Sequence, residues 1–353
     1  MKQLYKRLPL AILSLIGIIL LSSCRTSVFN FTIDYMKPAK ITLDDKIFKV
    51  AVINNVDNSD KTMSSPTMIK QNIGIPDIYV STITALATTD YFNNIIIAEQ
   101  KWIDSELDAK TLSEETANKI IDSLNVDAVI ALEQVDVEDY RSMENKDLSF
   151  VYETIVINPK VSIHSKLNTN YKEIVTKTDS LSILQPYTSN GRLISNMQLA
   201  NENQLLKAIG QSISDMITPN WKKAKRHLFT ENNLFAKSNT HYDNNNLEKA
   251  IEVCMKLYNK SNKKLVQMKA AHNISVFYEL EDELEQAKEW GLKAIEDGKA
   301  AYKIDDSTAQ TPEFLIENYP LYYHCVTQVE QISIRLKEKD TVKEQLNRFT
   351  VEI

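Results

Sequence analysis

Four carboxylate side chains stand close together in one short stretch of the sequence, "VIALEQVDVED". They are Glu133, Asp136, Glu138 and Asp139, and they end or follow an apolar run that is typical of a buried strand. Open α/β sheets often bind ligands beyond their strand ends, so paired acids there could act as general acid and base or hold a cation. The alternative is a solvated strand end without chemistry, which is common in proteins.

A histidine and a cysteine, His324 and Cys325, are adjacent in the sequence and raise the question of a nucleophile or a metal site. Neighbouring side chains on a helix do not face each other, so this pair cannot serve one centre without further partners. We expect Cys325 to lie in the core, since free cysteine is among the most buried residue types.

Other sequence patterns that carry chemistry are missing. There is no CxxC or HExxH spacing, and the six glycines of the chain form no phosphate-binding loop. We therefore predict no catalytic residue, no metal site and no cofactor, and we do not expect an enzyme.

The amino terminus has the order of a secretory signal. Basic residues come first, an apolar run spans residues 8–21, and two serines precede Cys24. A membrane-spanning helix needs about 20 apolar residues, so this run is too short to be an anchor by itself. We expect residues 1–23 to be a signal peptide.

The residues Leu21, Ser22, Ser23 and Cys24 resemble the bacterial lipobox, whose cysteine is acylated and becomes the first residue of the mature protein. The resemblance implies that Cys24 is lipidated, and two or more acyl chains give a stable membrane anchor. Arg25 follows, and lipoproteins of this kind without Asp at that position are usually sorted to the outer membrane. The alternative is an ordinary signal peptide cut near Ser23.

Composition places the mature chain among ordinary globular proteins. Hydrophobic residues make up 43% and charged residues 25% of the sequence, so the chain can bury a core. The net charge of −6 argues against a nucleic-acid partner, because such proteins usually carry a basic domain or stripe. Only Cys254 and Cys325 follow Cys24, and the sequence leaves open whether they form a disulfide.

Residues 45–218 are predicted to form a mixed α/β domain, preceded by a segment at 24–44 that contains a strand. Buried strands are expected at 48–56, 93–99 and 126–137, with helices at 75–88 and 111–124 between them. Thr111 and Glu114 have the spacing of a capping box at the start of the second helix. This β-α-β-α-β order favours neighbouring strands with helices packed across them.

After residue 148 the pattern changes to alternating polar and apolar residues, as in an antiparallel hairpin. An apolar stripe of helical period over residues 205–216 closes the domain. Residues 219–235 are predicted to be a linker helix. Its basic cluster at 222–226, "KKAKR", is expected on a solvated face, and contact with lipid headgroups or an acidic partner is the alternative.

Residues 236–353 are predicted to form helical hairpins. Two segments, 241–258 and 277–295, place Ala250 and Ala287 at corresponding positions, 37 residues apart. With Asn273, Tyr278 and Ala294 they fall at spacings similar to the tetratricopeptide consensus, which implies that they pack paired helices together. The period is longer than the usual ~34 residues.

Two family resemblances follow from these patterns. The segment from 45 to 218, with "FKVAVINNV" and "LNVDAVIALEQVD", looks like the amino-terminal α/β domain of the translocation protein TolB and like related periplasmic lipoprotein domains. Together with the helical end, the chain resembles Bacteroidota lipoproteins that join such a domain to tetratricopeptide-like helices. The relatives of the α/β domain are non-catalytic.

The predicted fold class is therefore α+β, with an amino-terminal mixed α/β sheet domain and an all-α tetratricopeptide-like domain. We expect a non-catalytic lipoprotein at the outer membrane, facing the periplasm, that binds a protein partner through the α/β domain and the concave face of the repeats. The alternative is a small-ligand-binding protein or enzyme that uses the acidic residues at 133–139.

Overall fold

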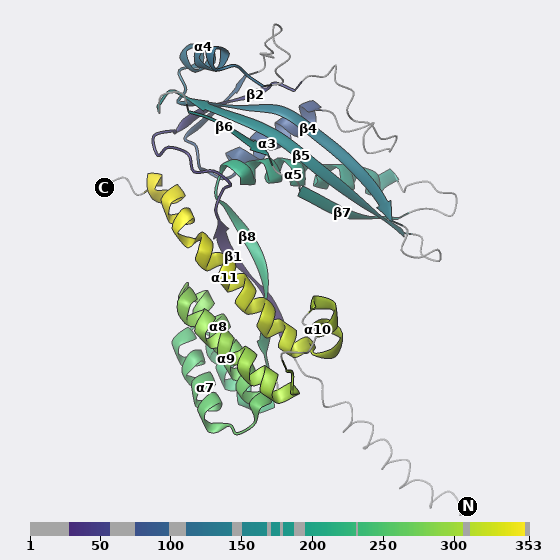
Figure 1. Cartoon of the computed structure of the whole chain (residues 1–353), viewed down its shortest axis with the longest axis vertical. Coiled ribbons are helices and arrows are strands. Elements are labelled where there is room, and N and C mark those ends of the chain that lie inside the picture. The colour runs from purple at the N-terminus through teal and green to yellow at the C-terminus, as the bar shows by residue number, and fades with distance from the viewer. Residues whose placement is uncertain are drawn as a thin grey trace, which may run out of the picture. The chain divides into compact units, whose positions relative to one another are not determined.

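The computed structural model describes residues 28–56, 75–98, 111–142, 150–167, 171–176, 179–186, 195–230, 232–305 and 311–349. The expected signal peptide at 1–23 and Cys24 lie outside these residues. The chain divides into a mixed α/β unit and a helical unit, each with its own core (Figure 1). This confirms the predicted fold class.

The sheet of the α/β unit begins with three parallel strands. β2 (Lys49–Asn54) lies between β3 (Asn94–Ala98) and β4 (Ala128–Ser142) and is parallel to both. β5 (Phe150–Ser165) then pairs antiparallel with β4, and it pairs on its other side with β6 (Tyr171–Thr176) and β7 (Asp179–Pro186). The predicted change from a β-α-β pattern to an antiparallel hairpin is thus confirmed.

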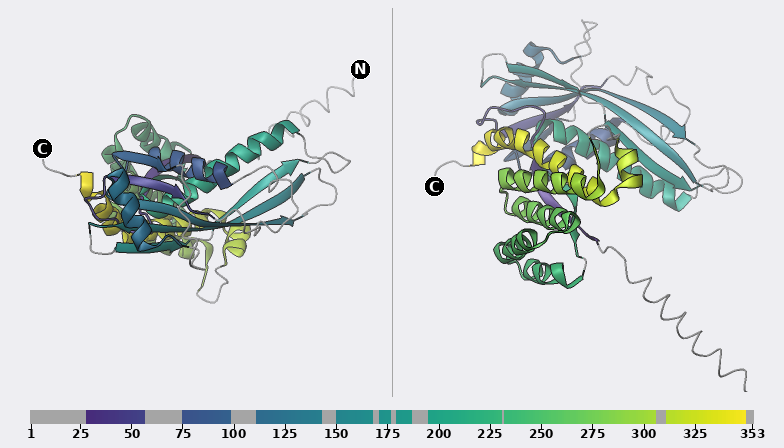
Figure 2. Two further views of the ribbon diagram at one scale, coloured as in Figure 1. Left: turned by 90° about the horizontal axis from the view of Figure 1, so that it is seen from above. Right: turned by 60° about the horizontal axis from the view of Figure 1, so that its bottom comes forward.

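The two faces of this sheet bury different residues because side chains alternate along a strand. On β2, Val50 and Val52 pack in the core beneath α3 (Ile75–Ala87) and α5 (Ser195–Ile217). Ala51 and Ile53 pack on the opposite face beneath α4 (Glu114–Leu124) (Figures 1 and 2). The sheet is therefore the middle of three layers.

Helix α4 begins at Glu114, two residues later than a capping box at Thr111 requires. The N-cap is Ser113, whose hydroxyl accepts a hydrogen bond from the Thr116 amide at 3.2 Å. The predicted capping box was wrong because Ser113, and not Thr111, directly precedes the helix and accepts a hydrogen bond from a main-chain amide of the first turn.

Hydrogen bonds of Gln345 tie the last helix of the chain into the α/β unit. The Gln345 side chain accepts a hydrogen bond from the Ala39 amide at 2.8 Å and donates to the Ile41 carbonyl at 2.9 Å. The main-chain carbonyl of Gln345 accepts a bond from the Tyr91 hydroxyl at 3.1 Å. Residues 340–349 accordingly belong to the α/β unit, whereas the sequence assigned them to the helical domain.

The helical unit contains two strands that the sequence assigned elsewhere. β1 (Val28–Lys37) pairs with β8 (Asn220–Phe229), and residues up to Tyr35 and from Lys222 onward belong to this unit. The predicted linker helix at 219–235 is wrong over 220–229. The "KKAKR" segment is extended, with alternating exposure, and Arg226 is buried, because its side chain has buried partners in this unit.

Four helices form the repeats: α6 (Asn232–Asp243), α7 (Leu247–Lys260), α8 (Lys264–Leu280) and α9 (Leu284–Tyr302). The turns after α6 and α8 carry left-handed residues at Asn245 and Asp282, which are 37 positions apart. Asn and Asp tolerate this backbone better than most residues, so Asp282 serves where a tetratricopeptide turn has glycine. Two further helices, α10 (Pro312–Asn318) and α11 (Pro320–Leu346), follow.

Helix length and composition bear on membrane insertion. Within the described ranges, no helix combines the length and apolar character needed to span a bilayer.

Gly210 allows α5 to approach α3 closely. A Cβ atom at this position would lie 2.5 Å from the main-chain carbon and oxygen of Ser81, and main-chain atoms cannot rotate away.

We predict that Gly210→Ala destabilises the α/β unit by about 1–3 kcal/mol despite the better helix propensity of alanine, because the helices must separate. Urea unfolding followed by circular dichroism measures the change. Lys207→Ala on the exposed side of α5 is the control, and equal stability of the two variants would show that the helices do not touch at Gly210.

Candidate functional site

Glu133 is buried and its carboxylate is fully used inside the α/β unit. It lies at an irregularity in the β4–β5 ladder, between Leu132 and Gln134. Its oxygens accept hydrogen bonds from the Asn55 side-chain amide at 2.6 Å, from the Leu112 main-chain amide at 2.9 Å and from the Ser162 hydroxyl. This carboxylate, from within β4, joins the end of β2, strand β5 and the segment just before α4.

Ser162 and His164 extend this network without forming a nucleophile and base. The Ser162 hydroxyl donates to Glu133, so it accepts from His164 Nε2 at 3.1 Å. A nucleophilic serine would instead give its proton to the histidine. Both side chains are also buried, so the arrangement supports the sheet and presents nothing to a substrate.

The four acidic residues do not form a strand end. β4 continues to Ser142, so Glu133, Asp136, Glu138 and Asp139 all lie within the strand, where the last three pair with Asn158, Val156 and Ile155 of β5. The placement beyond a strand end was wrong because pairing with the long β5 extends β4 past the parallel part of the sheet. Of Glu138 and Asp139, the structure describes the main chain alone.

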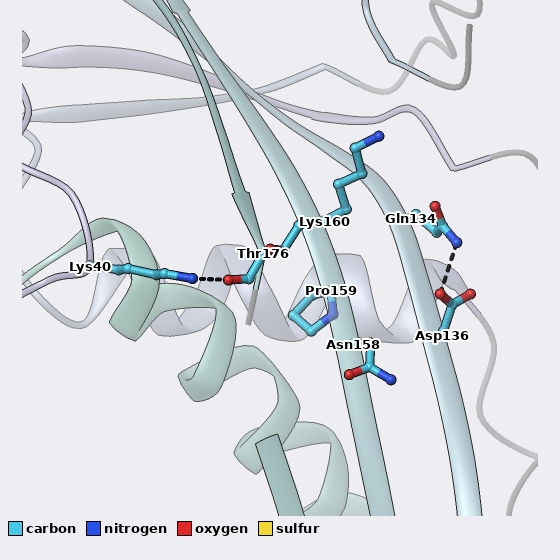
Figure 3. Close-up of a pocket in the computed structure, with 7 residues that line it drawn as sticks. All are labelled: Lys40, Gln134, Asp136, Asn158, Pro159, Lys160 and Thr176. Carbon is cyan, nitrogen blue, oxygen red and sulfur yellow. Dashed lines mark hydrogen bonds between the residues drawn. The ribbon is translucent and has the colours of Figure 1, made fainter. Parts of the chain in front are cut away.

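Asp136 lines a pocket of about 410 Å³ on the α/β unit (Figure 3). Its carboxylate accepts a hydrogen bond from Gln134 at 2.8 Å. Lys40 donates to the main-chain carbonyl of Thr176 at the end of β6. The pocket is lined by Lys40, Gln134, Asp136, Asn158, Pro159, Lys160 and Thr176.

The pocket lies beside a gap in strand pairing at Pro159. β5 pairs with β7 up to Ile157 and with β6 from Lys160 onward, so residues 158 and 159 pair with neither strand. Proline has no amide hydrogen to offer a partner strand, and it fits such a gap. The pocket carries two cationic side chains and one carboxylate, which suits a small polar ligand.

The residues singled out for repeat packing are buried in the helical unit. Ala250, Ala287, Ala294 and Asn273 have no exposed surface, and Tyr278 is partly buried. The Ser238 hydroxyl donates to the Ala250 carbonyl at 3.1 Å, and Ser275 donates to the Ala287 carbonyl at 2.6 Å. These two equivalent contacts repeat with the 37-residue period.

Asn273 binds main chain and not a neighbouring helix. Its side-chain oxygen accepts from the Phe229 amide and its side-chain nitrogen donates to the Phe229 carbonyl, both at 2.9 Å. On the same helix, His272 Nε2 donates to the His227 carbonyl at 3.0 Å. Helix α8 therefore holds strand β8 as it would hold an extended peptide. This side of α8 is covered by the chain itself.

Glu279 is the charged centre of this contact. Its carboxylate receives both Nε and Nη2 of Arg226 at 2.6 Å, Arg335 at 2.7 Å and Gln328 at 2.7 Å. Burial alone would raise the pKa of Glu279, but the hydrogen bonds and positive charges of Arg226 and Arg335 outweigh it and lower the pKa. The group is a structural ion pair, because all of its partners belong to the protein.

Three of the five histidines gather at the end of β8. The rings of His227 and His324 have centroids 4.0 Å apart, and His227 Nδ1 donates to Asn30 of β1 at 2.5 Å. Burial lowers the pKa of His272 to about 3, although its hydrogen bond to the His227 carbonyl acts in the opposite direction. Burial, followed by the charge of His227, lowers the pKa of His324 to about 4. Burial and the charges of Arg226 and Lys225 also lower the pKa of His227.

Both described cysteines are free and buried, so they do not form the disulfide that the sequence left open. Burial raises the pKa of Cys254 to about 12 and also raises the pKa of Cys325. A nucleophilic or metal-binding cysteine needs a thiolate, so neither residue is suited to these roles. Among the described residues, no three His, Cys, Asp or Glu side chains are placed to hold a metal ion.

The sequence did not single out Glu279 or the buried role of Arg226. One signal was present: Arg226 ends a basic cluster and stands two residues before the apolar Leu228, a period-two spacing that is typical of a strand. Glu279 stands in an acidic segment and is indistinguishable there from solvated neighbours.

The histidine cluster predicts loss of stability in mild acid. The unfolded chain binds these protons near pH 6.5, whereas the folded chain does not until the pH is well below that value. Stability should therefore fall as the pH drops from 7 to 5, by at most about 1.4 kcal/mol per pH unit for each histidine. Glu279 contributes its own loss only at lower pH, since its folded pKa lies below its usual range.

Urea unfolding of the mature chain at pH 7 and pH 5 measures this effect. His324→Gln should make the dependence shallower, and His241→Gln on α6, outside the cluster, should leave it unchanged. Equal stability at both pH values would contradict the assignment.

Solved structures similar to the chain include three from bacteria. A minor lipoprotein from Acinetobacter baumannii is 10% identical over 48% of this chain and 90% of its own, with a TM-score of 0.25. Rare lipoprotein B from Shewanella oneidensis is 10% identical over 47% and 89%, with a TM-score of 0.24. The hypothetical protein CT253 from Chlamydia trachomatis is 11% identical over 47% and 96%, with a TM-score of 0.26.

Two of these structures are lipoproteins, but the TM-scores are too low to carry an argument about function. Comparison with curated proteins gives no match.

Two family models match the sequence, and they meet near the start of the helices. Residues 236–319 match a family described as a domain of unknown function, DUF6340. Residues 47–229, which are more than half of the chain, match a second such description. This second match includes strand β8, although most of that strand packs in the helical unit. The chain thus belongs to the family described as domain of unknown function DUF8603.

Proposed function

We propose that the chain is a non-catalytic, membrane-anchored lipoprotein that acts as a protein-interaction or assembly module in the cell envelope. The observation that carries this proposal is the internal use of reactive side chains. Glu133, Glu279, Cys254 and Cys325 are buried, and both carboxylates have a full set of partners within the protein. A catalytic group must instead reach a substrate.

Membrane attachment is proposed from the signal at residues 1–23 and from Cys24. The likeness of this region to a lipobox supports acylation, and Arg25 supports the outer membrane, with the protein facing the periplasm. The resemblance to TolB-like domains and to lipoproteins with tetratricopeptide-like helices supports an assembly role.

The proposed partner surface excludes the part of α8 that the protein itself covers. Strand β8 occupies that face through Asn273 and Glu279. The partner surface is therefore placed on the remaining exposed faces of the two units.

A small polar ligand in the Asp136 pocket is the second candidate function. The observation that favours it is the combination of Asp136 with Lys40 and Lys160 around one cavity. In this case the carboxylate would bind a donor group and the lysines would bind an anionic group of the ligand.

We predict that Cys24→Ala prevents acylation, because the thiol is the acceptor of the lipid. The variant should leave the membrane fraction or accumulate as uncleaved precursor. Cell fractionation and mass spectrometry of the amino-terminal peptide measure this outcome. A wild-type protein with an unmodified mature amino terminus would end the lipoprotein proposal.

The two candidate functions differ in their dependence on the acidic residues of β4. We predict that the combined variant Glu133→Gln, Asp136→Asn, Glu138→Gln, Asp139→Asn keeps the partners that crosslink to the wild type in cells. Quantitative crosslinking and mass spectrometry measure the partners, and circular dichroism checks the fold.

Asp136→Asn alone is the control for the pocket, since it retains the buried Glu133. Loss of the same partners in the folded quadruple and single variants would favour the ligand site.

A further inference from the structure

The lipid anchor is joined directly to the helical unit and not to the α/β unit. Cys24 is four residues before Val28, where β1 begins. Four residues span at most about 14 Å. Val28 packs against the cluster that contains Phe229, Met268 and Cys325 of the helical unit. The bilayer must therefore lie close to this part of the helical unit, provided that Cys24 is lipidated as proposed above.

The direction of the two strands shows which end of the helices is close to the anchor. Arg226 of β8 contacts Glu279 near the end of α8, whereas Phe229 contacts Asn273 and Lys269 nearer its start. β8 therefore runs toward the amino-terminal end of α8.

β1 runs in the opposite direction along β8. Its residue Tyr35 lies beside Arg335, which binds Glu279, and its residue Asn30 contacts His227. Traced backward to Val28, β1 approaches the end of the unit formed by the turn from α7 to α8 (Figure 1).

This turn has the chemistry of a surface that meets anionic lipid. Lys260, Lys263 and Lys264 are exposed, and Leu265 beside them is 37% exposed. The turn lies within about one helical turn, ~6 Å, of Tyr258 and Met268, which both belong to the cluster around Val28. Basic residues near an anionic bilayer are attracted to it, and an apolar side chain can enter the headgroup layer.

The opposite end of the same helices has the opposite charge. The turn from α8 to α9 carries Glu281, Asp282 and Glu283, and α9 continues with Glu285. Helix α9 has 19 residues, so its two ends are about 27 Å apart. Near the basic turn, buried Asp297 is paired with Lys264 at 2.6 Å. Glu296, Glu313 and Glu317 on α9 and α10 would be repelled by anionic lipid. The attraction to anionic lipid is therefore assigned to the lysines of the turn at 260–265 alone.

We propose that the α7–α8 turn, residues 260–265, docks on the anionic phospholipid surface of the membrane that holds the lipid anchor. The helical unit is then oriented with its basic α7–α8 turn on the bilayer and its acidic α8–α9 turn away from it. Docking adds a second, electrostatic membrane contact to the acyl chains.

Fluorescent labelling of the full lipidated chain in vesicles tests the docking. Leu265→Cys carries a polarity-sensitive fluorophore, and Gln286→Cys at the acidic end of α9 is the matched control. Cys254 and Cys325 should stay unlabelled because burial raises the pKa of both thiols. Vesicles contain phosphatidylcholine alone or with phosphatidylglycerol, together with a quencher attached to the lipid headgroup.

We expect a blue shift and quenching at position 265 that require phosphatidylglycerol, with no change at position 286. Lys260→Glu with Lys263→Glu should reduce the docked population, by about fivefold for each lysine. Lys337→Glu with Lys339→Glu on α11 should have no effect. All variants should still sediment with the vesicles through their acyl chains.

Two failures are distinguishable. If the lipidated wild type does not sediment with vesicles, the anchoring in the proposed function is wrong. If it sediments but positions 265 and 286 respond equally, or if the lysine variants respond like the wild type, the docking proposal is wrong while the anchor stands.

Discussion

The helical unit depends on the buried carboxylate of Glu279. A charge removed from water is tolerated only when oppositely charged or hydrogen-bonding groups replace its hydration. Arg226 of β8, Arg335 and Gln328 of α11 supply these groups to one carboxylate on α8. Each partner comes from an element that is distant in sequence. The carboxylate therefore constrains a strand and two helices together, since an alternative packing would leave at least one charge buried without a partner.

The same contact changes how the repeats can work. A tetratricopeptide-like array usually offers a concave face to a partner, and an extended peptide would bind there through side-chain amides and charges. In this protein Asn273 and Glu279 already bind β8 in that way. The recognition chemistry of the array is thus used to hold the chain's own strand, and the interaction surface that we propose must lie elsewhere on the protein.

Much of the fold could be predicted from local pattern. The strands at 49–54 and 94–98 and the first part of β4 contain apolar runs with β-branched residues, and the stripe of Leu205, Ile209 and Ile213 has a helical period; these signals depend only on neighbours in sequence. The failures share another cause. The "KKAKR" segment is a strand because Arg226 meets Glu279, which is 53 positions away. Gln345 likewise binds main chain at Ala39, which is 306 positions away. Such pairings leave no periodic signal, because each involves one polar side chain.

The residues of the candidate site were likewise predictable only as far as local pattern reaches. The acidic pattern on β4 correctly drew attention to Asp136, which lines a pocket, but it did not separate this residue from Glu133, whose partners Asn55 and Leu112 bury it. Similarly, the sequence placed the lipidated segment before the α/β domain, although β1 completes the helical unit. If Cys24 is acylated as proposed, force on the acyl chains would enter the protein at β1, which is held by its pairing with β8. Arg226 of β8 binds Glu279 in turn, so a buried ion pair fixes β8 to α8. Strand β8, which covers α8, therefore also links β1, and with it the proposed membrane anchor, to the helices of this unit.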